Sequence, residues 1–199
     1  MAIYNGYNSG KTLFENADIS VEVKHKNNVI GLNIDQDTEN VNGGICSGIT
    51  TAWLIMLINN NDEAREAKFE ENFEITRFQG AYFKEIHGKA PDHIAAMNEA
   101  LDSRLHEVGT QTERKVIKFR LPLFPIWGAY VVVWGHAIGI AQFNKAYYIM
   151  DPNFGLYKYN SRDSFLKDFQ TIIDARAIKK NRGELDPATC IFFDRSTGL

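Results

Sequence analysis

The chain has 199 residues, of which 44% are hydrophobic and 12% aromatic, and this is enough apolar material for one buried core. The formal net charge is −3 and 24% of the residues are charged, so the composition excludes a basic nucleic-acid-binding protein and a charged disordered tail. The two cysteines are too few for a disulfide scaffold, and their different settings argue against a bridge between them.

No membrane span is expected, because the longest apolar run, residues 52–58, is shorter than the ~18 residues that a helix needs to cross a bilayer. Residues 1–15 lack the apolar core of a signal peptide, so we expect a soluble chain that folds in a reducing cytoplasm. The chain contains no internal repeat, low-complexity tract or linker. A single domain over residues 1–199 is therefore the prediction.

The first part of the chain, residues 1–40, is polar and rich in turns, and we expect a loosely packed lead-in with short strands at 19–23 and 29–34. A glycine-rich turn over 42–48 follows and leads into a helix over 48–59. This helix is apolar on nearly all sides, which is typical of a helix buried in the centre of a domain.

The next two segments, 62–77 and 92–107, have mixed charges with apolar spacing and predict helices that cover the core and face water. A strand-rich second half follows, because β-branched and aromatic residues gather in short runs. The predicted strands are 115–121, 126–134, 136–142, 146–151, 156–159 and 190–194. A helix over 161–175, with Ser161 as its N-cap, lies before the last strand. Helices followed by an antiparallel sheet predict an α+β fold.

Cys46 lies directly before the predicted buried helix. A helix N-terminus lowers the pKa of a thiol, and the neighbouring glycines allow close approach to a substrate and leave N–H groups for an oxyanion hole. A buried structural thiol is the alternative for any free cysteine. Cys190, within the apolar run CIFF, is expected to be such an inert, packed thiol.

His136 is the one of five histidines that opens an otherwise apolar strand, WGHAIGIA, so its ring needs a partner. If residues 142–145 form a four-residue hairpin loop, Ala141 pairs with Ala146 and His136 faces Asp151 on the same side of the sheet. A carboxylate in that position can orient the imidazole. Together with Cys46, these two residues indicate a nucleophilic cysteine site.

Three segments resemble the YopT/AvrPphB family of bacterial effector cysteine proteases: GGICSGITTAWL around Cys46, WGHAIGIA around His136 and YYIMDPNFGLYKY around Asp151. The resemblance implies a papain-like fold, with the buried helix that carries the cysteine packed on the antiparallel sheet that carries the histidine and the aspartate. It also implies that Cys46 is the nucleophile, that His136 is the general base and acid, and that Asp151 orients His136. Asn40 or Asn42 would complete the oxyanion hole.

The reaction that this resemblance implies is the hydrolysis of a peptide or amide bond in a host protein through an acyl-thioester. The chain would be a bacterial effector or toxin domain, secreted into the host cell without a cleavable signal peptide. Deamidation of glutamine or asparagine, or transglutaminase-like acyl transfer, uses the same triad and stays open. A catalytically inactive papain-like binding module is the third alternative.

No cofactor is implied by this chemistry. No Cys or His pair has the spacing of zinc ligands, so no metal site is expected. The stretch Gly6-Tyr-Asn-Ser-Gly-Lys-Thr resembles a phosphate-binding loop, but it has one residue too few between its glycines and no buried strand before it. Nucleotide binding is therefore not expected.

Overall fold

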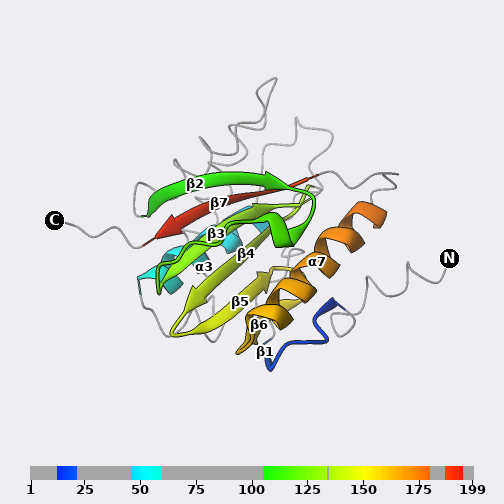
Figure 1. Ribbon diagram of the computed structural model, residues 1–199, viewed down its shortest axis with the longest axis horizontal. Helices are drawn as coiled ribbons and strands as arrows, with labels where there is room; N and C mark the ends of the chain where they lie inside the picture. The colour runs from blue at the N-terminus through cyan, green and yellow to red at the C-terminus, as the bar shows by residue number, and fades with distance from the viewer. Residues whose placement is uncertain (1–12, 22–45, 60–104, 134, 180–186, 195–199) are drawn as a thin grey trace, which may run out of the picture.

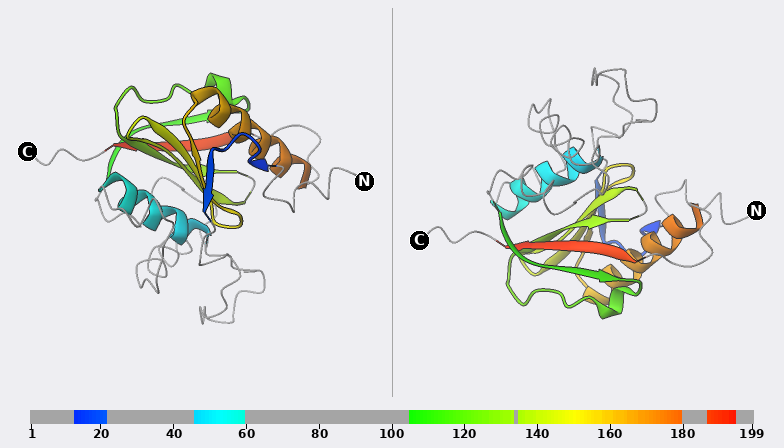
Figure 2. Two further views of the ribbon diagram at one scale, coloured as in Figure 1. Left: turned by 90° about the horizontal axis from the view of Figure 1, so that it is seen from below. Right: turned by 90° about the horizontal axis from the view of Figure 1, so that it is seen from above.

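The structure is a computed structural model that describes residues 13–21, 46–59, 105–133, 135–179 and 187–194. Within these ranges, seven strands form one sheet in the order β1-β6-β5-β4-β3-β7-β2, and each neighbouring pair is antiparallel. Helix α3 lies on one face of the sheet and α7 on the other (Figures 1 and 2). This arrangement confirms the predicted α+β class, with the buried helix packed on an antiparallel sheet.

The strands are β1 Ile19–Val21, β2 His106–Glu113, β3 Trp127–Val132, β4 Ala137–Phe143, β5 Ala146–Asp151, β6 Gly155–Tyr159 and β7 Ala188–Asp194. The helices in the described part of the chain are α3 Cys46–Ile58, the short 3-10 helix η1 Val116–Lys118 and α7 Arg162–Lys179. None of the helices in the ranges described above is long and apolar enough to cross a membrane.

Helix α3 is buried along almost its whole length, as its apolar sequence predicts. The sheet face beneath it is formed by alternate residues of the central strands, because side chains of a strand point to its two faces in turn. Tyr130 on β3, Ala141 on β4 and Met150 on β5 are among the buried residues that pack with α3.

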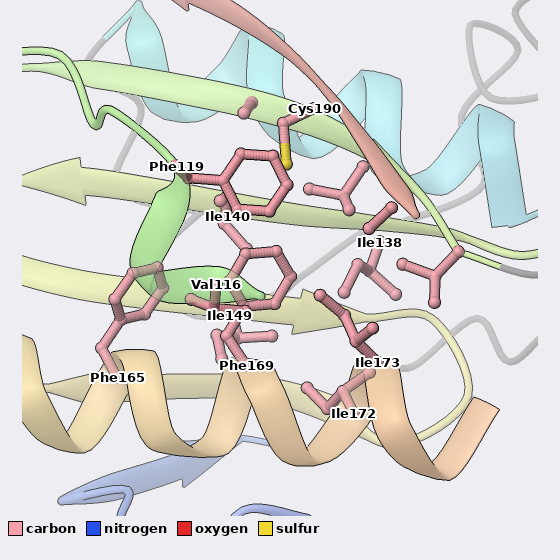
Figure 3. Close-up of a cluster of buried hydrophobic side chains, with 14 of the residues drawn as sticks. Val116, Phe119, Ile138, Ile140, Ile149, Phe165, Phe169, Ile172, Ile173 and Cys190 are labelled. Atoms are coloured by element: carbon pink, nitrogen blue, oxygen red, sulfur yellow. The ribbon is translucent and has the colours of Figure 1, made fainter. Parts of the chain in front are cut away.

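The opposite sheet face packs against α7 (Figure 3). Phe165, Phe169, Ile172 and Ile173 of α7 are all buried at helical spacing against the other set of alternate strand residues, which includes Ile138, Ile140 and Ile149. The predicted N-cap of α7 is confirmed, since the Ser164 N–H donates a hydrogen bond of 3.4 Å to Ser161 Oγ. The helix runs four residues beyond the predicted end.

One strand prediction is wrong, and one strand was not predicted. Residues 115–121 contain the helix η1 and no strand, although their composition is strand-like. The strand β2 was missed because its charged and polar residues resemble a solvent-facing helix, and the predicted helix over 92–107 therefore extends wrongly into His106 and Glu107. Edge position explains this composition, because β2 is the last of the described strands and, among them, only β7 pairs with it.

The described part of the expected lead-in, residues 13–21, is packed on the domain. Phe14 stacks on Tyr157 with ring centroids 3.5 Å apart, and Asn16 donates hydrogen bonds from its backbone N–H and its side-chain amide to Asp168 on α7. β1 covers the first part of the strand predicted at 19–23. The strand predicted at 29–34, the helix at 62–77 and most of that at 92–107 lie outside the described residues.

Candidate active site

Cys46 is the first residue of α3, two residues earlier than the predicted helix start. Hydrogen bonds hold this end of the helix on the sheet: Thr50 Oγ1 donates to the Ala137 carbonyl oxygen (3.2 Å) and Tyr130 Oη donates to Ser47 Oγ (2.8 Å). The side chain of Cys46 is half-buried, and the helix has its free backbone N–H groups at this end. The thiol therefore lies in the electropositive field that stabilises a thiolate.

His136 is fixed by a tight turn between β3 and β4. Val133 and His136 exchange two backbone hydrogen bonds of 2.9 and 3.0 Å, and Gly135 between them has φ 70°, which glycine adopts without strain. The residue directly precedes β4 and is only 4% exposed. The imidazole is thus held in one place at the end of the sheet, next to the start of α3.

Asp151 ends β5 and is fully buried. Its Oδ1 accepts a hydrogen bond of 2.9 Å from His136 Nε2 and another of 2.9 Å from the backbone N–H of Asn153. The Phe154 N–H donates to the Asp151 carbonyl oxygen (3.0 Å), so the chain turns tightly after the strand. Asp151 and His136 are therefore brought together by two neighbouring turns of one sheet.

The hairpin that joins β4 and β5 differs from the predicted one. Its loop has two residues, Asn144 and Lys145, both with positive φ (50° and 65°), instead of the four that we expected. Phe143 therefore pairs with Ala146, and the predicted register is wrong by two residues. An even shift leaves every side chain on its predicted face, so His136 and Asp151 meet diagonally instead of directly opposite each other.

The electrostatics of Cys46 and His136 are mutual. Burial raises the pKa of the Cys46 thiol, but the hydrogen bond and the positive charge of His136, with the Ala137 N–H, outweigh burial and hold that pKa below its usual value. Burial lowers the pKa of His136, but the charge and hydrogen bond of Asp151, with the hydrogen bond to Cys46, raise it overall. Because Nε2 faces Asp151, Nδ1 is the ring nitrogen left for the thiol. This arrangement favours a thiolate–imidazolium pair.

Asp151 stays ionised in this setting. Burial raises the pKa of its carboxyl, but the charge and hydrogen bond of His136 outweigh burial and lower the pKa overall. The same negative charge, second to burial, raises the pKa of Tyr157 to about 12. The carboxylate can therefore accept a hydrogen bond from the imidazole N–H and fix the orientation of the ring.

The structure adds two residues that sequence reasoning missed. Asn153 places its backbone N–H on Asp151 and its side-chain amide 3.4 Å from His136 Nε2. Arg176, near the end of α7, is 5% exposed, and its charge acts on the site from the sheet face that α7 covers. The spacing of Arg176 from the apolar residues of α7 was the available signal, since it continues their buried face. Asn40 and Asn42, the predicted oxyanion-hole residues, lie outside the described residues.

Cys190 lies on β7, is fully buried, and does not belong to the site. Burial raises the pKa of its thiol well above the usual value. Over the described ranges, no three His, Cys, Asp or Glu side chains are grouped as ligands for a metal ion.

Two solved structures are similar to this one. The crystal structure of the Pseudomonas avirulence protein AvrPphB matches with a TM-score of 0.59 and 17% identity, over 77% of this chain and 93% of that chain. PatoxP, a cysteine protease-like domain of the Photorhabdus asymbiotica toxin PaTox, matches with a TM-score of 0.56 and 13% identity, over 98% of this chain and 61% of that chain. Neither a protein-family model nor a curated protein sequence matches the chain. The chain has the papain-like cysteine protease fold, as its resemblance to the YopT/AvrPphB family implied.

Proposed function

We propose that this chain is a cysteine protease that attacks a peptide bond of a protein substrate through Cys46. His136 acts as general base and acid, and Asp151 orients it. The observation that carries the proposal is the contact of His136 with both partners: its Nε2 lies 2.9 Å from Asp151 Oδ1, and a hydrogen bond and its charge lower the pKa of Cys46. A buried structural thiol needs neither feature.

The first half of the reaction forms an acyl-enzyme. The Cys46 thiolate attacks the carbonyl carbon, and the negative charge that develops on the carbonyl oxygen is stabilised by the Cys46 backbone N–H and by Asn40 or Asn42. The His136 imidazolium then gives its Nδ1 proton to the leaving amine. The C–N bond breaks, and the acyl group remains on the sulfur as a thioester.

The second half releases the acid. Neutral His136 takes a proton from water at Nδ1, and the resulting hydroxide attacks the thioester carbonyl. The thiolate leaves, and the protonated imidazole restores the ion pair. Throughout, Asp151 accepts a hydrogen bond from the Nε2–H group and keeps Nδ1 directed toward the sulfur.

The similar structures support a role outside the producing cell. One is an avirulence protein and the other is a domain of a toxin. By extension, this chain is a bacterial effector or toxin domain that is secreted and cleaves a protein of a host. Incubation with candidate host proteins tests the bond attacked: a fragment indicates proteolysis, whereas an intact protein in which a side-chain amide has become an acid indicates deamidation through the same thioester.

The rate of iodoacetamide alkylation of Cys46 against pH tests the site itself. We expect the Cys46 thiolate to form at a pH well below the pKa of ~8.5 of a free cysteine. In His136→Ala, we expect the thiolate to form only near that ordinary pKa. His106→Ala is the matched control, because His106 also contacts an aspartate, Asp194, but is exposed on β2 away from Cys46. If the alkylation of Cys46 in the wild type has the pH dependence of a free cysteine, the role of Cys46 as nucleophile is refuted and an inactive binding module is favoured.

A further inference from the structure

Arg176 occupies a position on α7 that an apolar residue would normally fill. It follows Ile172 by four residues and Ile173 by three, so it continues the face of the helix that Phe165 and Phe169 begin. The residue is 5% exposed, and its Nε and Nη2 atoms are buried. Arginine is almost never buried without an opposite charge nearby. The position of this charge therefore needs a reason.

The candidate active site lies at the end of the sheet toward which α7 runs. Figure 3 shows Phe165, Phe169 and then Ile173 along the helix, with Ile173 close to Ile138. Ile138 directly precedes Gly139, which pairs with Met150, so the same register brings Ile138 opposite Asp151. Asp151 shares a sheet face with Ile149, which packs on α7. One turn beyond Ile173, Arg176 therefore reaches the side of the sheet that carries the carboxylate.

The ionised site has an unbalanced charge. A Cys46 thiolate, a His136 imidazolium and an Asp151 carboxylate together carry one net negative charge in a buried place, which is costly. In addition, Asp151 Oδ2 is buried and has no hydrogen-bond partner among the described residues, because both hydrogen bonds given above go to Oδ1. One further positive charge would neutralise the group.

We propose that Arg176 is a positioning residue for this site: its buried positive charge, behind Asp151, favours the ionised forms of Cys46 and Asp151 and balances the net negative charge that they leave on the ionised site. The inference rests on the proposed function and adds a fourth charged group, from the helix on the opposite sheet face to α3. The electrostatics agree with the geometry. After burial and the contacts among the three residues themselves, the Arg176 charge further lowers the pKa of Cys46, of His136 and of Asp151.

The titratable and charged groups that face this region, over the described ranges, are Cys46 from α3, His136 before β4, Asp151 from β5, Tyr157 from β6 and Arg176 from α7. The reactive pH window opens where the thiolate forms and closes where the imidazolium is lost. Because the Arg176 charge lowers the pKa of both groups, its removal moves both limits to higher pH. Structural damage alone would lower reactivity at every pH without moving them.

The experiment measures both limits in the wild type, Arg176→Met and Arg176→Lys. Iodoacetamide alkylation of Cys46 against pH gives the lower limit, and an NMR titration of His136 in protein with isotope-labelled histidine gives the upper one. Lys167→Met is the matched control, because it removes a positive charge from the exposed side of α7. Arg176→Gln, which keeps a polar side chain, replaces Arg176→Met if that variant does not fold.

We expect both limits to move to higher pH in the neutral variants, with an alkylation rate about tenfold lower at a pH below the wild-type lower limit. Arg176→Lys should restore the wild-type limits, and Lys167→Met should leave them in place. If the thiolate forms at low pH in the wild type and at the same low pH in Arg176→Met, the role of Arg176 is overturned while the proposed function stays intact. If the wild-type thiolate forms only at the pH of an ordinary cysteine, both the role of Arg176 and the proposed function are overturned.

Discussion

The two free cysteines show how the surroundings of a residue decide its chemistry. Cys46 begins a helix and contacts His136, whereas Cys190 lies in the middle of β7 with its sulfur in the apolar cluster beneath α7 (Figure 3). Burial acts on both thiols in the same direction and raises the pKa of each. Only at Cys46 do a donor and a positive charge outweigh it, so only this thiol is expected to react.

Native protein treated with iodoacetamide at neutral pH should therefore incorporate one label, at Cys46. Cys190 should react only after unfolding in denaturant, because its thiol is fully buried and its raised pKa keeps it protonated. Peptide mass spectrometry before and after denaturation measures this. Cys46→Ser is the control and should take up no label in the native state. Rapid labelling of Cys190 in the native protein would contradict the packing of β7.

At this scale the sequence was informative for residues that stand out from their neighbours. Cys46 precedes a buried helix, His136 interrupts an apolar strand, and Asp151 ends one, so each could be singled out without a structure. Arg176 could not be connected with them, because 25 positions separate it from Asp151 and it lies on a different element, α7, and no local pattern reports how close the two come. Asn153 was missed since its role depends on the turn after β5.

Between elements, the close approach of α3 to β4 positions the thiol. A Cβ atom on Gly139 would lie 2.5 Å from Trp53 Cζ3 and 2.6 Å from its Cε3, both in a rigid ring. The glycine is therefore required for the helix to lie directly on the strand that begins beside His136. The spacing of Cys46 from His136 depends on this contact. Thr50, one turn after Cys46 on α3, donates a hydrogen bond to the carbonyl oxygen of Ala137, the residue that follows His136 and begins β4.

Gly139→Ala is expected to lower the free energy of unfolding by about 1–3 kcal/mol through overpacking, and to slow alkylation of Cys46 because α3 is pushed away from His136. Chemical denaturation and the alkylation rate measure the two effects. Gly128→Ala is the matched comparison: its Cβ would meet Leu54 Cδ2 at 2.7 Å, but that atom ends a flexible side chain, so the cost should be smaller. Equal costs would argue against the rigid contact with Trp53.

The hairpin between β4 and β5 shows what could be predicted about elements. Their β-branched and aromatic residues identified both strands, and the structure confirms the two strands. The loop length was wrong, because Asn144 and Lys145 form a two-residue turn that requires positive φ at a lysine, which sequence statistics disfavour. The predicted contact of His136 with Asp151 is still present, because a shift of two residues keeps both side chains on the same face of the sheet.

For the whole molecule, the order of the strands was beyond sequence reasoning. β2 and β7 pair although more than seventy positions separate them in the chain, and β7 lies between β2 and β3. Such pairings depend on which edges remain open after the hairpins form, and local patterns carry no information about that choice. The same holds for residues 13–21, where Phe14 stacks on Tyr157 of β6 and Asn16 bonds to Asp168 of α7.

The attachment of this segment gives the molecule a pH-dependent stability. Asp168 is 1% exposed and accepts hydrogen bonds from Asn16, yet burial outweighs these bonds and raises the pKa of its carboxyl. An acid with a raised pKa in the folded state adds stability below its unfolded value of 3.8, and this stability is lost as the pH rises through the folded value. At neutral pH, Asp168 therefore opposes folding relative to acid pH.

Asp168→Asn removes this pH-dependent contribution. The substitution should lower the free energy of unfolding more at about pH 3, where wild-type Asp168 is protonated in both states, than at pH 7, where the wild type carries the cost of a buried carboxylate. Urea denaturation at the two pH values measures the difference. Asp163→Asn, on the exposed first turn of α7, controls for the loss of one carboxylate. A larger cost at pH 7 would mean that the Asn16 hydrogen bonds outweigh burial, and that the ionised carboxylate itself attaches residues 13–21 to α7.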